Sequence, residues 1–194
     1  RMLEDVDDDG VYDRATTYVG GLAWPTAVAC FDGGILVGAA PDILYCKDLD
    51  GDGRADTTEV VFTGFHLTNV QGLLNTLKWS LDNRIHGATS SSGADVVRAG
   101  SGDLPLSLRG RDFSIDPWKQ TIRAESGGAQ PGLSVDDAGR KYLSHNSDHI
   151  QMTLYEDRYF ARNPFYAPPQ ARKSIASDGP AADVFRVSPV EPWR

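Results

Sequence analysis

The sequence predicts an all-β protein, a β-propeller fragment of about three to four four-stranded antiparallel blades. Three observations predict this fold. An acidic loop at 5–13 recurs at 48–56, which is 43 residues later from Asp5 to Asp48. An apolar strand, a tight turn and a second strand recur about 50 residues apart. No segment has convincing amphipathic-helix spacing. A repeat in the low forties with several strands per unit is typical of propeller blades.

The repeats divide the chain into units within a single partial propeller domain. We place the blades at roughly 1–23 (partial), 24–72, 73–129 and 130–194. A long insertion, 156–182, rich in proline and aromatic residues, interrupts the last unit. The chain opens inside a blade and stops soon after its last predicted strand, so we expect a fragment of a longer protein.

Each blade begins with a predicted hairpin. The paired first and second strands lie in 26–40, 75–89 and 131–145, where the turns combine Asp with Gly or Asn. The third strands are predicted as "DILYCK", "ADVVRAG" and "HIQMTLYE". The fourth strands are predicted as "EVVFTG" and "LSLRGRDFSID", and a final strand as "DVFRVSP".

The second acidic loop, "DLDGDGRADTTE", has the spacing of a calcium loop. Acids occupy positions one, three, five, nine and twelve, and a glycine at six permits the sharp turn. Position seven supplies a backbone carbonyl. The flanking segments are β-rich, which favours a structural ion over an EF-hand switch, and the alternative is a solvated acidic turn without an ion. The predicted ligands are Asp48, Asp50, Asp52, Arg54, Asp56 and Glu59.

The first loop, "DVDDDGVYD", repeats the same layout. Its twelfth position is Thr16 rather than an acid, so the shared unit is the nine-residue loop. Each ion is expected to close the connection between the third and fourth strands of a blade. The predicted ligands of this loop are Asp5, Asp7, Asp9, Val11 and Asp13.

Composition narrows the possible partners. The net charge is −8 without a basic patch, which argues against nucleic acid. No 18-residue apolar run is present, so no membrane span is predicted. Cys30 and Cys46 fall on the first and third strands of one blade, so we expect two buried thiols and no disulfide. Weak calcium loops fill at extracellular calcium levels, which favours a periplasmic, extracellular or cell-surface location.

Several longer motifs carry a family resemblance. They are "DGGILVGAAPDILYCKDLDGDGRAD", "LRGRDFSIDP", "GLSVDDAGRKYLSHNSDHI", "DRYFARNPFYA" and "SIASDGPAADVFRVSPVEPWR". Together they resemble the N-terminal propeller of the planctomycete-type membrane-bound dehydrogenases, which is similar to the glucose/sorbosone dehydrogenases. The resemblance implies oxidation of a sugar or alcohol with calcium and the quinone cofactor PQQ. It also implies a haem c domain or cytochrome as electron acceptor.

The chain departs from the sugar dehydrogenases at three places. Gly128 and Ala129 stand where that group has an Arg–Asn pair, and 144–147 replaces an acidic–His–Gly–Pro turn. Asn75 lies near the place of the catalytic histidine. A base for hydride abstraction would have to come from elsewhere. The second function class is therefore a non-catalytic, calcium-stabilised propeller that binds carbohydrate or protein.

The polar groups left for a catalytic site cluster at one predicted turn. His145, Asn146, Asp148 and His149 are the catalytic candidates, with Asp148 able to orient a histidine. The alternative is that they cap the turn by hydrogen bonds. The blade connection at 64–73 should reach the same rim, opposite the acidic loops. We therefore expect its two polar residues to bind a cofactor there, namely His66 and Gln71.

Two further groups have structural predictions. Trp24, Trp79 and Trp118 are expected to pack between blades, because large aromatic rings usually fill cores. The run "RGRD", 109–112, is expected to make an ion pair between blades rather than a phosphate site.

Overall fold

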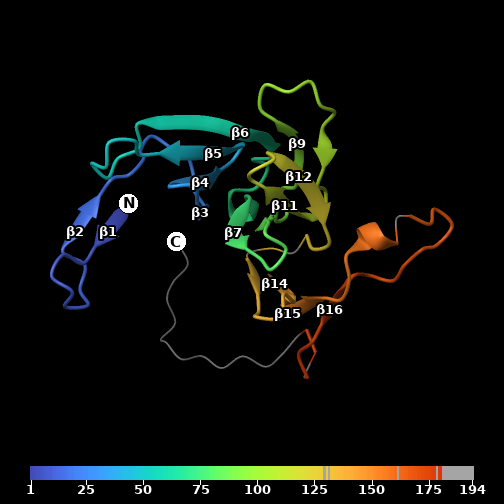
Figure 1. Ribbon diagram of the computed structural model, residues 1–194. Helices are drawn as coiled ribbons and strands as arrows, with labels where there is room; N and C mark the ends of the chain where they lie inside the picture. Colours follow the sequence, from blue (N-terminus) through green and yellow to red (C-terminus); the bar gives the residue numbers. More distant parts are fainter. Residues whose placement is uncertain (129, 131, 161, 178, 181–194) are drawn as a thin grey trace.

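The computed structural model describes residues 1–128, 130, 132–160, 162–177 and 179–180 (Figure 1). Within these residues the protein is all-β, and its only helices are two 3-10 turns, η1 (Val70–Gly72) and η2 (Asp157–Tyr159). The strands form antiparallel sheets that do not close into a barrel, which confirms the predicted open propeller. None of the described helices has the length and apolarity needed to cross a bilayer.

A two-stranded hairpin carries the first acidic loop. It joins β1 (Met2–Glu4) to β2 (Arg14–Thr16), and Glu4 pairs with Arg14 at its closing end. Figure 1 shows this hairpin, in blue, reaching away from the other sheets.

The first full blade carries the second acidic loop, which joins its third and fourth strands. Its strands lie side by side in chain order: β3 (Ala27–Phe31), β4 (Gly34–Ala39), β5 (Asp42–Lys47) and β6 (Thr57–Phe65). Lys47 pairs with Thr57 at the mouth of the loop. Both loops are therefore closed by residues ten positions apart, and the 43-residue repeat seen in the sequence holds in the strand register.

The second and third blades have four strands each. The second contains β7 (Asn75–Trp79), β8 (Ile85–Ala88), β11 (Asp112–Asp116) and β12 (Thr121–Glu125). The third contains β13 (Leu133–Val135), β14 (Lys141–His145), β15 (Asp148–Thr153) and β16 (Arg172–Ser174).

The predicted third strand of the second blade pairs elsewhere. The segment "ADVVR" forms β9 (Ala94–Arg98), which pairs with β6 of the first blade, and β10 (Leu106–Ser107) pairs with β9. The long β6 would otherwise present an unpaired edge, and pairing with β9 covers part of it. The segment 112–116, predicted as part of a fourth strand, is instead the third strand of its blade.

The end of the chain also differs from its prediction. The fourth strand of the third blade, β16, lies inside the segment 156–182 that we interpreted as an insertion. The excursion therefore returns to its own sheet earlier than expected. The last predicted strand, 183–189, lies outside the described residues.

The main core lies between the first two blades. The second blade contributes its alternate, apolar positions Ile85, Phe113 and Ile115, which pack with Phe62 and Phe65 of β6. The other face of the second blade is polar and turns toward the third blade. Small apolar contacts between those two blades come from Ala88 with Leu133 and Leu143.

Two predictions about packing fail in part. Cys30 and Cys46 are free thiols as expected, but Cys30 is exposed. It alternates with Ala29 and Phe31, which face the core, so its own side chain faces away. Trp79 and Trp118 of the second blade do pack against Phe31 of the first, as predicted. All three tryptophans nevertheless lie outside the core, since Trp24 is 60% exposed, Trp79 40% and Trp118 69%.

Candidate functional site

The two acidic loops have the same internal geometry. In the first, carboxylate oxygens of Asp5, Asp7 and Asp13 lie within 4.8 Å of one another. In the second, Asp48, Asp50 and Asp56 do the same. These are positions one, three and nine of each loop, so the repeat preserves the arrangement of side chains as well as the spacing.

Backbone amides fix the acids in matching ways. The amide of Gly53 donates to Asp48 Oδ2 (2.8 Å) and that of Leu49 to Asp56 Oδ2 (2.7 Å). In the first loop the amide of Gly10 donates to Asp5 Oδ2 (2.9 Å) and that of Val6 to Asp13 Oδ2 (2.9 Å). The first and ninth positions thus accept equivalent bonds in both loops.

Backbone amides of the second loop also favour the ionised form of Asp48, the acid at position one. Hydrogen bonds from Gly51 and Gly53 lower the pKa of Asp48 below its ordinary value. A carboxylate that stays ionised is the form a cation requires.

The remaining predicted ligands lie outside the two triads. Asp9 accepts from the amide of Val11 (2.8 Å), and Asp52 accepts from that of Arg54 (2.8 Å). Glu59, the twelfth position, lies on β6 opposite Tyr45 and lines a separate cavity.

The first hairpin docks on the second acidic loop. The Tyr18 hydroxyl accepts from the amide of Asp48 (3.0 Å), and the Tyr18 carbonyl accepts from the amide of Ala55 (2.7 Å). A Cβ added at Gly53 would come within 2.7 Å of the Met2 side chain. The segment after β2 therefore holds both ends of the loop.

The four residues predicted as catalytic do form one turn, between β14 and β15. His145 Nδ1 lies 3.0 Å from Ser147 Oγ, and Asp148 Oδ2 accepts from Gln151 Nε2 (2.6 Å). Asp148 therefore orients neither histidine in the described structure, and Asn146 and His149 are exposed. These contacts match the alternative of a hydrogen-bonded turn.

The predicted cofactor-binding pair lies in the connection between the first two blades. His66 Nε2 is 3.2 Å from Asp95 Oδ2, and its Nδ1 is 3.2 Å from the Ser92 carbonyl. Gln71 is exposed within η1, and its backbone N–H donates to Asn69 Oδ1 (3.0 Å). No hydrogen bond or ion pair among the described residues joins this pair to the turn at 146–147.

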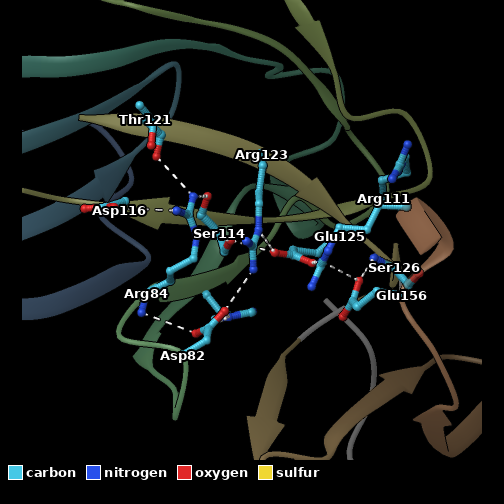
Figure 2. Close-up of polar contacts among 12 residues, drawn as sticks. Asp82, Arg84, Arg111, Ser114, Asp116, Thr121, Arg123, Glu125, Ser126 and Glu156 are labelled. Atoms are coloured by element: carbon cyan, nitrogen blue, oxygen red, sulfur yellow. Dashed lines mark hydrogen bonds and ion pairs between the residues drawn. The ribbon is translucent and has the colours of Figure 1, made fainter. Parts of the chain in front are cut away.

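A partly buried charged network that we did not predict lies between the second and third blades, with the fully buried Glu125 at its centre. Arg123 reaches from β12 between two acids, donating to Glu125 Oε1 (2.6 Å) and Asp82 Oδ2 (2.9 Å), as Figure 2 shows. Arg158, which follows the third blade's β15, also pairs with Glu125. Lys141 pairs with Glu156, whose Oε2 accepts from the Ser126 amide (2.7 Å).

The network contains a potential metal triad, but its charges are already compensated. Asp82, His86 and Glu125 have ligand atoms within 4.8 Å of one another. Arg123 bridges both acids, and His86 Nε2 bonds Asp82 (3.1 Å). Burial lowers the pKa of His86, despite the neighbouring Asp82. The arrangement is therefore that of a structural ion-pair cluster.

The two glutamates of the network differ in pKa. Burial opposes ionisation of both. Hydrogen bonds, including those from Ser114 and Arg123, outweigh burial and lower the pKa of Glu125. Burial and the nearby Glu125 together raise the pKa of Glu156. Glu125, with no exposed surface, is thus the anionic centre of the cluster.

One family matches this chain over residues 1–193, and its description is "Domain of unknown function (DUF7133)". The chain belongs to the DUF7133 family. No curated protein and no solved structure matches this DUF7133 domain.

Asp112 is the other buried acid of the DUF7133 domain that sequence reasoning missed. It starts β11 opposite Glu125, and its side chain has no exposed surface. Burial raises its pKa to about 7. The Gly128 and Thr89 amides lie near enough to oppose this rise, but neither carboxylate oxygen has a well-formed hydrogen bond among the described residues.

The expected ion pair in 109–112 is present. Arg111 Nη2 lies 2.6 Å from Asp157 Oδ1 and so joins the second blade to the segment after β15.

A pattern in the sequence could have predicted the rest of the charged network. In β11 and β12, polar residues alternate with apolar ones, which predicts a second, polar face on that blade.

Proposed function

We propose that this DUF7133 domain is a calcium-stabilised propeller whose role is binding rather than catalysis, with one calcium ion in each acidic loop. The observation that carries the proposal is the repetition of one triad, at positions one, three and nine, in two loops 43 residues apart. Chance acidic clusters would not share the amide bonds from position two to position nine and from position six to position one.

The donor set fits calcium. Calcium binds oxygens at about 2.3–2.6 Å, so two ligands of one ion lie at most about 5 Å apart. The carboxylate oxygens of each triad lie within 4.8 Å of one another. The carbonyls of Val11 and Arg54, together with water, would complete a shell of six to eight oxygens.

The location of the loops suggests a structural role. Each loop is the only covalent link between its two strands, β1 with β2 and β5 with β6. An ion would neutralise three clustered carboxylates and fix the register of the hairpin. A periplasmic or cell-surface location, where calcium is plentiful, suits such a role.

PQQ fits the described residues poorly. This cofactor carries three carboxylates and needs cationic partners. One predicted polar set contains the acid Asp148, and His66 of the other lies against Asp95. No hydrogen bond or ion pair among the described residues joins the two sets. The oxidation of a sugar or alcohol with transfer to haem c, which the family resemblance implies, therefore has less support than a binding role.

Calcium titration tests the proposal. Isothermal titration calorimetry of the full chain should show two sites. Asp7→Ala and Asp50→Ala should each remove one, and Asp103→Ala, an exposed acid outside the loops, should leave both. At a calcium concentration 100 times the dissociation constant, each site should add about 2.7 kcal/mol to the free energy of unfolding.

Two results would count against the proposal. Absence of calcium binding below millimolar concentration would refute the ion sites. Dye reduction by the chain with PQQ, calcium and an aldose would refute the non-catalytic role and restore the dehydrogenase alternative.

A further inference from the structure

Two exposed tryptophans, Trp79 and Trp118, flank the partly buried Phe31 at the end of the blades that also carries the second acidic loop. Phe31, at the end of β3, packs edge-on against Trp118 with ring centroids 4.7 Å apart, and its centroid lies 6.5 Å from that of Trp79. Trp118 belongs to the turn between β11 and β12 and is 69% exposed. Burial in a core does not explain why such large apolar rings lie here, whereas ligand sites commonly display them.

A cavity of about 250 Å³ opens beside these rings. Its walls combine the aromatic side chains Phe31, Tyr45 and Trp118 with polar side chains from three different elements. The polar residues are Asp32 in the β3–β4 turn, Glu59 on β6 and Gln120 in the β11–β12 turn.

The walls of the cavity are held by hydrogen bonds within the first blade. The Tyr45 hydroxyl donates to the Asp32 carbonyl (2.9 Å), and Lys47 Nζ lies 3.5 Å from Asp32 Oδ2. Glu59 makes no hydrogen bond or ion pair among the described residues, and the same holds for the Gln120 side chain. Carboxylate and amide groups are therefore available to a ligand next to an aromatic platform.

We propose that this cavity binds one ring of a neutral oligosaccharide. An aromatic ring stacks on the apolar C–H face of a pyranose, while carboxylate and amide groups bond the hydroxyls at its edge. Its volume lies just below the range of about 300–1,000 Å³ typical for drug-sized ligands, so it suits a single ring. The proposal rests on the proposed binding role and gives it a ligand class.

The charge of the cavity selects among sugars. Asp32 and Glu59 line the cavity, and of the two only Asp32 pairs with a lysine, Lys47, so the surroundings are net negative and disfavour uronic acids and sulfated sugars. A simple cation is less well matched than a sugar. Lys47 already pairs with Asp32, and the amide of Gln120 offers both a donor and an acceptor, which hydroxyl groups use and an ammonium group does not.

A larger cavity of about 1,130 Å³ lies on the other face of the first blade, to which Cys30 and Ile35 belong, and meets the first cavity at the edge of the blade. It shares Phe31, Asp32 and Trp118 with the smaller cavity and adds Trp79 and Val28. Trp79 Nε1 donates to the Cys30 carbonyl (3.0 Å), so this second ring is also held in place. An oligosaccharide longer than one ring would have to pass this edge at Phe31 to reach Trp79.

The saccharide site and the second acidic loop share two strands. Tyr45 and Lys47 lie on β5 just before the loop, and Glu59 lies on β6 just after it. An ion in the loop would fix the register of these strands and hence the walls of the cavity.

Binding can be tested with defined sugars. The calcium-loaded full chain is titrated with cellohexaose, mannohexaose and xylohexaose, following tryptophan fluorescence and calorimetry. At least one should bind saturably. Trp118→Ala should weaken it at least about tenfold, equivalent to 1.4 kcal/mol. Trp24→Ala is the matched control, since Trp24 is 60% exposed and lines neither cavity, and it should change nothing.

The outcomes separate this proposal from the calcium proposal. Gln120→Ala should weaken sugar binding and leave the calcium titration unchanged, because Gln120 lines the cavity and belongs to neither acidic loop. Sugar binding without calcium binding would refute only the calcium proposal. The saccharide proposal is overturned if no hexasaccharide binds with a dissociation constant below about 10 mM, or if Trp118→Ala has no effect. It is also overturned if hexagalacturonate or tetramethylammonium binds more tightly than all three neutral sugars.

Discussion

Replacing Asp112 by asparagine should change how the stability of the domain depends on pH. The side chain is fully buried at the start of β11, and Gly127 covers it so closely that an added Cβ would lie 1.8 Å from Asp112 Oδ2. Lys141 and Arg172 are the nearby cations, but burial dominates and raises the pKa to about 7. Asparagine has the same shape and cannot ionise.

The sign follows from the two pKa values. Between about pH 4 and pH 7 native Asp112 keeps its proton, while the unfolded chain, with the ordinary value of 3.8, releases it. The unfolded state then binds fewer protons, so stability falls as the pH rises through this window. At about 1.4 kcal/mol per pH unit, the loss reaches roughly 4 kcal/mol above pH 7. Asp112→Asn should not suffer this loss.

Urea unfolding from pH 4 to pH 8, followed by tryptophan fluorescence in EDTA, measures the difference. The variant should match the wild type near pH 4 and exceed it by roughly 4 kcal/mol at pH 8. EDTA removes any contribution of bound calcium, and Asp103→Asn provides an exposed acid as control. A difference between variant and wild type that stays constant across this range would refute the reasoning.

Three further substitutions probe the packing. Glu125→Ala should cost about 3–5 kcal/mol in urea unfolding, because it leaves Arg158 and Arg123 without their buried anion; a cost under about 1 kcal/mol would show that the cluster is solvated. Phe113→Ala should cost about 3–5 kcal/mol, since the ring is fully buried between the first two blades. Gly127→Ala should lower the melting temperature through its clash with the Asp112 carboxylate, whereas Gly102→Ala, with open space around it, should not; equal effects would contradict the close contact.

Local signals made most of the fold predictable. The three hairpins that begin the blades were found from their tight turns, such as Asp32–Gly33, and the acidic loops from their spacing. Each of these features depends on residues within a few positions of one another. The segment 42–47 was predicted with its exact strand bounds for the same reason.

The residues of β9 do not by themselves predict which strand β9 pairs with. The residues "ADVVR" suit any sheet edge, and the choice is made by the free edge of β6, far away in the sequence. One signal was available. Gly64 lies inside a β-rich run, and an added Cβ there would lie 2.1 Å from the Asp95 carbonyl oxygen. A glycine within a strand often marks such a close approach of another backbone.

The candidate sites show the same division between local and distant information. The acidic triads follow from spacing alone, whereas the charged network joins residues from 82 to 158 and needs the fold to assemble it. The exposure of Trp118 could not be foreseen, because a tryptophan in a turn between strands has the same local pattern whether it packs or faces solvent.

The two faces of the second blade hold their neighbours by different means, and this determines how the third blade is attached. Toward the first blade the contact is an apolar core, which tolerates small shifts. Toward the third blade the apolar contact is small, and ion pairs run from Glu125 to Arg158 and from Arg111 to Asp157. Glu125 is fully buried, and an ion pair to a buried acid adds little net stability but costs much when one partner is removed. The segment after β15 is therefore anchored to the second blade through charge and geometry, and it is from this anchored position that the chain returns to form β16.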